Sequence, residues 1–266
     1  MLGTDHSTVA RRIEALEKEL KLRLVDRRAR AYSLTSVGQE IRDLAVRVET
    51  TIGDIERFAR GTAGLPQGLV RVSGPPGVTT YFIAPRLLKL QHQHPNLQIE
   101  LIGETREVSL SRGEADIVLR MSRPQENGLV ARKVGEISYG LYGSEDYLRD
   151  RPPDTWDFLG LDETRDHAPQ QRWLRTITGD RKLTLRASEY MTLIGAVRAG
   201  LGVAVLPQGM AYYDKSLKEV ATSTLAPSRD LWLVFHRDGG KALAIRAVID
   251  HLTAIFKNEW AMLRDR

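Results

Sequence analysis

Cysteine is absent from this sequence of 266 residues. Its absence excludes disulfides, thiol catalysis and zinc–thiolate sites, and it fits a cytoplasmic protein. No apolar run approaches the roughly 18 residues of a transmembrane helix, and the N-terminus lacks an apolar signal segment. We therefore expect neither membrane insertion nor export, and we expect a cytoplasmic location.

Catalytic motifs are also missing. No serine stands in a Gly-x-Ser-x-Gly turn, and no phosphate-loop lysine pattern occurs. Gly195, Gly200 and Gly202 have the wrong spacing for a nucleotide-binding loop. His92 and His94 lie two residues apart at a predicted helix end, so their side chains diverge. We expect no enzymatic activity, no cofactor and no metal site.

The overall composition is that of a globular protein, with 42% hydrophobic and 27% charged residues. The length allows one large or two to three small domains. A net charge of +5 leans weakly toward polyanionic partners. Most of the 39 cations are spread along the chain as ordinary surface residues.

The most informative segment is a basic amphipathic helix predicted over residues 7–20. Ser7 is a candidate N-cap, and one apolar stripe recurs at steps of four, three and four residues; its members are Val9, Ile13, Leu16 and Leu20. Arg11 and Arg12 point away from most of the stripe, where they can meet an anion. Such helices lie in DNA major grooves, and they also lie on many ordinary protein surfaces. The stripe alone leaves both interpretations open.

A short basic hairpin is predicted directly after this helix. Arg27, Arg28 and Arg30 precede an alternating stretch, residues 32–36. A basic hairpin after a basic helix is the layout of a winged helix-turn-helix, whose wing reaches DNA phosphates or the minor groove. Residues 1–30 contain eight Lys/Arg and five Asp/Glu, a net charge of only +3, so charge alone does not decide the matter.

A long helix is expected from Val37 to about Arg60. Its apolar positions recur every three or four residues, which suits either a seam with a second helix or the surface of a globular core. They are Ile41, Leu44, Val48, Ile52, Ile55 and Phe58. Gly and Pro in residues 61–68 then break the helix and mark the clearest domain boundary.

The pattern changes to α/β after Gly68. Strands are predicted at 69–73, 97–101 and 115–119, with a tight loop at 74–77, a helix that continues through 86–90, and a short helix at 108–112. Strand–helix–strand with short turns is a βαβ unit of a parallel sheet. Further strands are expected at 183–187, 202–207 and 231–235. A helix capped by Ser188 should end at Gly200, and a last helix should cover 244–256. We predict a two-lobed α/β binding fold, which receives ligands in the cleft at the strand ends.

The N-terminal block resembles the DNA-binding domain of LysR-type transcriptional regulators. The matching positions are Ser7, Val9, Arg11, Arg12, Ile13, Leu16, Glu17, Leu24, Arg27, Leu34, Thr35 and Gly38. Ala10 and Val25 depart mildly from the family pattern, which favours serine and phenylalanine there. The family has about two more helices upstream, so we expect this chain to hold a partial winged helix-turn-helix.

The resemblance continues through the α/β part. Its signatures are Ala84-Pro85, His94-Pro95, Gly113 to Asp116 and, most specifically, residues 199–207. The family's effector domain is similar to type II periplasmic binding proteins. The implied organisation is a DNA-binding part at 1–36, a linker and dimerisation helix at 37–61, a hinge at 62–68 and an effector domain at 69–257. Lobe I would cover about 69–140 and 236–257, and lobe II about 141–235.

The resemblance also implies the site residues. Double-stranded DNA would be contacted by Ser7, Thr8, Arg11, Arg12, Arg27, Arg28 and Arg30. A small effector would lie between the lobes against Gly77, Val78, Thr79, Gly103, Thr105, Arg120, Met121, Ser188, Glu189 and Tyr190. Helix N-termini suit an anionic effector. Val78 cannot donate a hydrogen bond where the family often has serine or threonine, and Thr79 would substitute if its helix begins one residue later. Arg120 either clamps the anion or pairs with a neighbouring acid, and Ser188 either only caps its helix or also binds.

These features predict a regulator that senses a small anionic metabolite and forms a homodimer or homotetramer. Two alternatives are a truncated regulator that dimerises and binds effector without specific DNA binding, and a solute-binding protein of the same fold. The second predicts an export signal and no amphipathic dimer helix, and the sequence shows the opposite.

Overall fold

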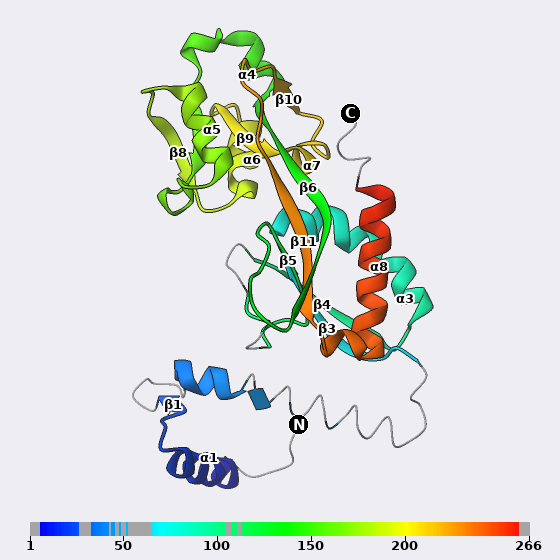
Figure 1. Cartoon of the computed structure of the whole chain (residues 1–266). Helices are drawn as coiled ribbons and strands as arrows, with labels where there is room; N and C mark the ends of the chain where they lie inside the picture. The colour runs from blue at the N-terminus through cyan, green and yellow to red at the C-terminus, as the bar shows by residue number, and fades with distance from the viewer. Residues whose placement is uncertain are drawn as a thin grey trace. The chain divides into compact units, whose positions relative to one another are not determined.

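The computed structural model describes residues 6–26, 33–42, 44, 45, 48, 52, 65–104, 108–110 and 113–260. The chain forms two compact units. The N-terminal unit comprises Met1–Gly64 with Ser111–Glu114, and the C-terminal unit comprises Leu65–Leu110 with Ala115–Arg266 (Figure 1). No helix of the described residues is long and apolar enough to cross a bilayer.

The N-terminal unit contains the predicted basic helix and hairpin. Helix α1 (His6–Leu20) is followed by strands β1 (Val25–Asp26) and β2 (Ser33–Leu34), which pair antiparallel. The helix begins at His6, so Ser7 lies inside the first turn and the N-cap prediction was wrong. The turn after α1 uses the left-handed conformation of Lys21 (φ 54°), and the Glu17 carboxylate accepts the Leu24 N–H at 2.7 Å.

A threonine and a glycine join the hairpin to the next helical segment. The Thr35 N–H and hydroxyl donate to the carbonyls of Leu24 and Arg23, and the same hydroxyl accepts the Gly38 N–H at 2.9 Å. A Cβ atom at Gly38 would lie 2.0 Å from the Leu24 carbonyl oxygen, so only glycine permits this approach. The spacing Leu-Thr-x-x-Gly in the sequence therefore has a packing cause.

The predicted linker helix is described at a minority of its positions. Residues 36–42, 44, 45, 48 and 52 are helical, and Leu44, Val48 and Ile52 are exposed. Most of 49–61, with Ile55 and Phe58, lies outside the described residues.

The C-terminal unit is built on one nine-stranded sheet. The strands follow the order β4-β3-β5-β11-β6-β9-β7-β8, with β10 paired to β6. Their bounds are β3 Gly68–Gly74, β4 Leu97–Gly103, β5 Ile117–Arg120, β6 Leu129–Ser144, β7 Phe158–Leu161, β8 Leu183–Ala187, β9 Val203–Pro207, β10 Leu217–Val220 and β11 Ser228–His236.

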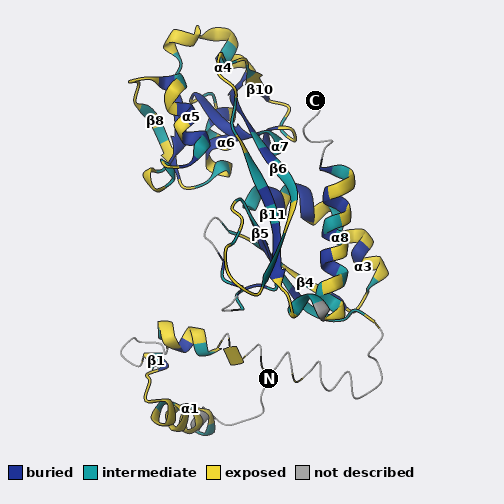
Figure 2. Cartoon of the chain, viewed as in Figure 1, coloured by how far each residue is buried: buried dark blue, intermediate teal, exposed yellow. Residues whose placement is uncertain are grey.

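Two long antiparallel strands, β6 and β11, run through both halves of the sheet (Figure 1). On one side β11 pairs with β5, which continues into the parallel strands β3 and β4. On the other side β6 pairs with β9, which continues into the parallel strands β7 and β8. The expected two-lobed α/β architecture is confirmed, and the crossing strands are partly buried along their middle, with Ile137, Tyr139 and Leu231 buried (Figure 2).

Helices cover both lobes. In lobe I, α8 (Leu243–Glu259) packs against β3 and β6 through Val248, Leu252 and Phe256, which are all buried. The other helices are α3 (Leu87–Gln93) in lobe I and α4 (Glu145–Asp150), α5 (Pro169–Thr178), α6 (Tyr190–Arg198) and α7 (Gln208–Ala211) in lobe II. Short helical turns are η2 (Ala84–Arg86), η3 (Pro153–Thr155), η4 (Glu163–Arg165) and η5 (Gly239–Lys241).

Several predicted boundaries need correction. The helix expected through 86–90 is divided into a π-helix, η1 (Val78–Ile83), the turn η2 and α3, because Pro85 interrupts it. Residues 108–110 are not helical, and β5 begins two residues later than expected. Strand β5 begins later because Asp116 pairs with Arg71 through its side chain as well as its backbone. The Asp116 carboxylate accepts the Arg71 N–H at 2.8 Å, and the Asp116 N–H donates to the Arg71 carbonyl.

Candidate functional site

A cavity of about 520 Å³ opens where the strands of the C-terminal unit end. Its wall combines the loop after β3, the start of η1, the end of β5, the middle of β6, the starts of α6 and α7, η4 and one residue of β11. This size is typical of small-molecule sites, and the position matches the strand-end cleft expected for an open α/β sheet.

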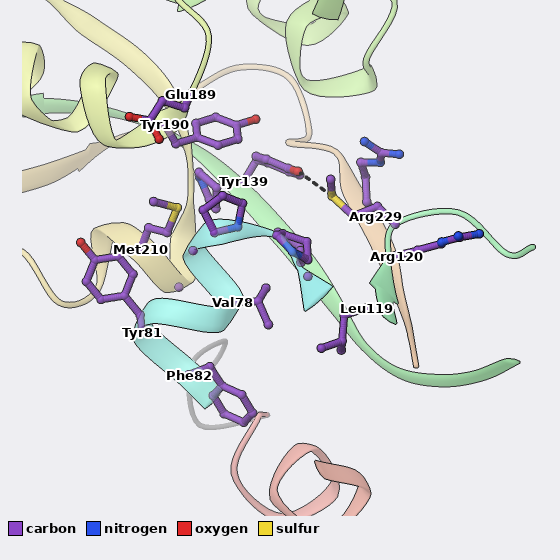
Figure 3. A pocket seen from close by; sticks show the side chains of 18 of the residues that line it. Val78, Tyr81, Phe82, Leu119, Arg120, Tyr139, Glu189, Tyr190, Met210 and Arg229 are labelled. Atoms are coloured by element: carbon purple, nitrogen blue, oxygen red, sulfur yellow. Dashed lines mark hydrogen bonds between the residues drawn. The ribbon is translucent and has the colours of Figure 1, made fainter. Parts of the chain in front are cut away.

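Six of the ten predicted effector residues line this cavity. They are Gly77, Val78, Arg120, Met121, Glu189 and Tyr190. Figure 3 shows Val78 on η1 and Tyr190 at the start of α6.

The remaining four predicted residues lie elsewhere. Thr79 is buried, and its hydroxyl donates to the Pro76 carbonyl at 3.0 Å, so it does not replace the missing donor at Val78. Gly103 ends β4 beneath Thr79 and does not line the cavity. Ser188 is exposed, because Glu189 takes the N-cap position of α6 and the helix begins at Tyr190. Thr105 lies outside the described residues.

Arg120 lines the cavity and uses part of its guanidinium group on the protein itself, while its buried Nε has no hydrogen-bond partner among the described residues. Its Nη2 donates to the Val108 carbonyl at 2.5 Å, and its Nη1 lies 3.6 Å from a carboxylate oxygen of Glu126. Figure 3 shows the guanidinium directed away from Tyr139 and Val78. The simpler of the two interpretations of Arg120, pairing with a neighbouring group, fits these contacts.

The apolar wall is formed by aromatic rings and thioethers that no sequence signal singled out. Trp260 donates its indole N–H to the Glu136 carbonyl at 3.0 Å and packs edge-on against Phe82 at 4.8 Å between ring centroids. Tyr81 stacks on Tyr213 at 5.6 Å and donates its hydroxyl to the Met191 sulfur at 3.3 Å. These rings therefore turn mainly carbon surface toward the cavity.

Two tyrosine hydroxyls form a polar end of the cavity. The Tyr139 hydroxyl donates to the Met121 sulfur at 3.7 Å, and the Tyr190 hydroxyl accepts from the Gln170 amide at 3.0 Å (Figure 3). Burial raises the pKa of both hydroxyls, so both stay protonated at neutral pH. The positive charge of Arg229 opposes this rise at both hydroxyls.

Of the residues predicted to contact DNA, three have described side chains, all of them on α1. Arg11 and Arg12 are exposed on α1, and Thr8 is half-buried in its first turns. Nothing is described of the Ser7 side chain, and the hairpin arginines Arg27, Arg28 and Arg30 lie outside the described residues.

Comparison with known families matches both units. Residues 63–257 match the LysR substrate binding domain, and residues 1–39 match the bacterial regulatory helix-turn-helix protein of the lysR family. The chain belongs to the LysR family of transcriptional regulators. This LysR-type regulator thus carries an effector-binding domain after a DNA-binding helix-turn-helix, and the rival prediction of a solute-binding protein has no support.

Individual relatives of the chain are also transcriptional regulators. The LysR-type chain is 28% identical over 269 residues to an HTH-type transcriptional regulator of Xanthomonas campestris, covering 94% of the chain and 78% of that protein. It is 32% identical over 165 residues to an HTH-type transcriptional repressor of Pseudomonas aeruginosa. That match covers 60% of the chain and 52% of the repressor, so the alignment spans about half the relative's length.

Solved structures share the fold. The LysR-type regulator CrgA of Neisseria meningitidis superposes with a TM-score of 0.63 at 23% identity, covering 97% of this chain and 92% of CrgA. The Vibrio cholerae virulence activator AphB gives a TM-score of 0.60 at 21% identity, covering 95% of this chain and 91% of AphB.

Proposed function

We propose that this LysR-type regulator binds a small anionic metabolite in the cavity of its C-terminal unit and that this binding changes its affinity for promoter DNA. The observation that carries the proposal is the cavity beside the two crossing strands. Since β6 and β11 contribute to the wall and run through both lobes, a ligand there would alter how the lobes are held. The protein would act in the cytoplasm, where its DNA is, and without catalysis.

The proposed division of labour follows the sequence. Residues 1–36 read DNA, 37–61 pair with a second copy, 62–68 act as a hinge, and 69–257 bind the effector, with lobe boundaries near 140 and 235. The exposed apolar side chains of Leu44, Val48 and Ile52 support pairing, because they recur at steps of four on one helical face. The pair would be a homodimer or part of a homotetramer.

DNA contact is assigned to α1. Arg11 and Arg12 are exposed, and within the described residues neither forms a hydrogen bond or an ion pair. With Thr8 and Ser7 at the same end of the helix, they suit contact with phosphates and base edges. Arg27, Arg28 and Arg30 would extend the contact from the hairpin.

Fluorescence anisotropy with DNA from upstream of the chain's own gene tests this assignment. Replacing Arg11 and Arg12 by alanine should weaken binding and reduce the slope of log affinity against log salt by about 2, about one unit per lost phosphate contact. The matched control is Arg246→Ala with Lys257→Ala, two exposed cations on α8 of the other unit. An unchanged slope in the α1 variant would remove these arginines from the DNA interface.

A further inference from the structure

We propose that the cavity contains an anion subsite formed by Arg229, Arg165 and Tyr139, and that it takes a monocarboxylate with a flat, apolar body. This inference rests on the proposed effector-binding role and names the chemical class of the ligand. It differs from the sequence-based assignment, which placed the anion at Arg120 and the start of α6.

Arg229 is the first member of this subsite. It lies near the start of β11, is half-buried and lines the cavity. Within the described part of the chain its guanidinium forms no hydrogen bond or ion pair, although its charge acts on the hydroxyls of Tyr139 and Tyr190. A half-buried guanidinium without a carboxylate partner favours an external anion, because its five N–H donors match a carboxylate in a fork geometry.

Arg165 supplies a second positive charge to the same place. It ends η4 in lobe II, lines the cavity and, like Arg229, acts on the Tyr139 hydroxyl. Arg229 comes from a strand shared by the lobes and Arg165 from lobe II alone. An anion held between them would therefore tie lobe II to the crossing strand.

Tyr139 completes the subsite, because its hydroxyl now donates only to a weak acceptor. Its present acceptor is the Met121 thioether at 3.7 Å, and thioether sulfur accepts weakly. Gln170 donates to Tyr190, which is hydrogen-bonded to Tyr139, so the donor chain ends at that sulfur. A carboxylate oxygen would replace it as a much stronger acceptor. Figure 3 shows the Tyr139 hydroxyl and Arg229 on the same side of the cavity, away from Tyr81 and Met210.

The rest of the wall selects the body of the ligand. Tyr81 and Trp260 already use their polar atoms on Met191 and on the Glu136 carbonyl, so they offer ring faces rather than donors. A sugar-like body would lose its hydrogen bonds to water there without replacement, whereas a flat apolar body would gain contact with the rings.

The charge balance of the cavity selects a single negative charge. Three acidic side chains, Glu104, Glu136 and Glu189, line the same cavity as the arginines. Three arginines, Arg120, Arg165 and Arg229, also line the cavity, and Arg120 already donates to a carbonyl and lies near Glu126. Repulsion from the acids disfavours a dianion or trianion.

Isothermal titration calorimetry with three probes tests the class. The probes are trans-cinnamate, its uncharged analogue cinnamamide, and succinate, a dianion without an apolar ring. We expect trans-cinnamate to bind and the other two to bind at least about tenfold more weakly, the difference that one lost charge-assisted hydrogen bond pair produces. Equal binding of cinnamamide, tighter binding of succinate, or no binding of any probe at millimolar concentration would overturn the proposal.

Two variants test the residues. Arg229→Ala should weaken trans-cinnamate at least about tenfold, whereas Arg237→Ala, an exposed arginine that follows β11 and does not line the cavity, should leave it unchanged. Tyr139→Phe keeps the buried ring and removes only the hydroxyl, so it should weaken binding several-fold with little change in melting temperature. Parental affinity in folded Arg229→Ala, or loss only in Arg120→Ala, would contradict the subsite.

Failure of the subsite and failure of the regulator role give different results. If trans-cinnamate binds through Arg229 but no ligand alters promoter affinity, the subsite stands and the sensing role falls. If another small molecule alters promoter affinity equally in the parent and in Arg229→Ala, the sensing role stands and the subsite falls.

Discussion

The contact between Trp260 and Gly135 predicts a sign reversal in a double-mutant cycle. A Cβ atom at Gly135 would lie 2.6 Å from the indole nitrogen of Trp260. The ring has little room to move, since it is held by the Glu136 carbonyl and packs against Phe82 and Phe256, with centroid distances of 4.8 and 5.1 Å. Adding one methyl group at Gly135 should therefore destabilise the C-terminal unit, by about 1–3 kcal/mol for overpacking.

Removing the ring should destabilise the unit more. Trp260 is only 9% exposed. Burying about 200 Å² of ring at about 25 cal/mol per Å² contributes about 5 kcal/mol, and the indole hydrogen bond adds about 1 kcal/mol. The unfolded chain already buries part of this area, so we expect Trp260→Ala to lower the free energy of unfolding by about 3–5 kcal/mol.

The cycle separates the two effects. Without the ring there is nothing for the new methyl group to strike, so Gly135→Ala in the Trp260→Ala background should be neutral or should stabilise by up to about 1 kcal/mol through the unfolded state. Urea unfolding followed by tryptophan fluorescence suits this test, because all four tryptophans of the chain lie between residues 156 and 260. Equal destabilisation by Gly135→Ala in both backgrounds would refute the packing argument.

Four further variants test contacts at three other residues. Asp116→Ala should lower the free energy of unfolding by about 1.5–3 kcal/mol, because it removes the charge-assisted hydrogen bond to the Arg71 N–H. Asp116→Asn should lower the free energy of unfolding less. Urea titration measures both losses, and equal losses would argue against that hydrogen bond. Burial, together with the charge of Lys89, lowers the pKa of His251, so the unfolded chain takes up a proton first as the pH falls. Stability should therefore decline from about pH 7 to about pH 5 and decline less in His251→Gln, and parallel pH profiles would contradict this. Gly38→Ala should force the helical segment that begins at residue 36 away from Leu24. The rate of amide hydrogen exchange at Val25 and Thr35 should then rise. Unchanged exchange rates would mean that the contact between Gly38 and Leu24 can relax.

The strands that sequence patterns predicted are those whose burial is simple. The residues of β9 are all buried and the segment reads as a continuous apolar run, and β8 alternates with one residue in two exposed. Strand β6 was not predicted, because its first half carries Arg132, Lys133 and Glu136 on a partly solvated surface. Its extended conformation is set by pairing with β11, a contact about 100 residues away along the chain, which local patterns do not report.

The residues of the candidate site likewise fall into those that the sequence could predict and those that it could not. Residues of βα turns, such as Gly77, Val78 and Tyr190, could be predicted because the end of a strand in a parallel sheet fixes where the cleft lies. Arg165 and Arg229 could not be predicted, because they are two of 39 cations and stand in no recognisable motif. What distinguishes Arg229 is that its guanidinium has no partner among the described residues, and that property has no counterpart in the sequence.

A crystal structure of the protein with trans-cinnamate bound tests the central claim most directly. We predict the ligand in the cavity of the C-terminal unit, with its carboxylate within hydrogen-bonding distance of the Arg229 guanidinium and the Tyr139 hydroxyl and its ring against Tyr81 and Trp260. A carboxylate bound instead at Arg120 or at the first turn of α6, or a ligand outside this cavity, would contradict the account.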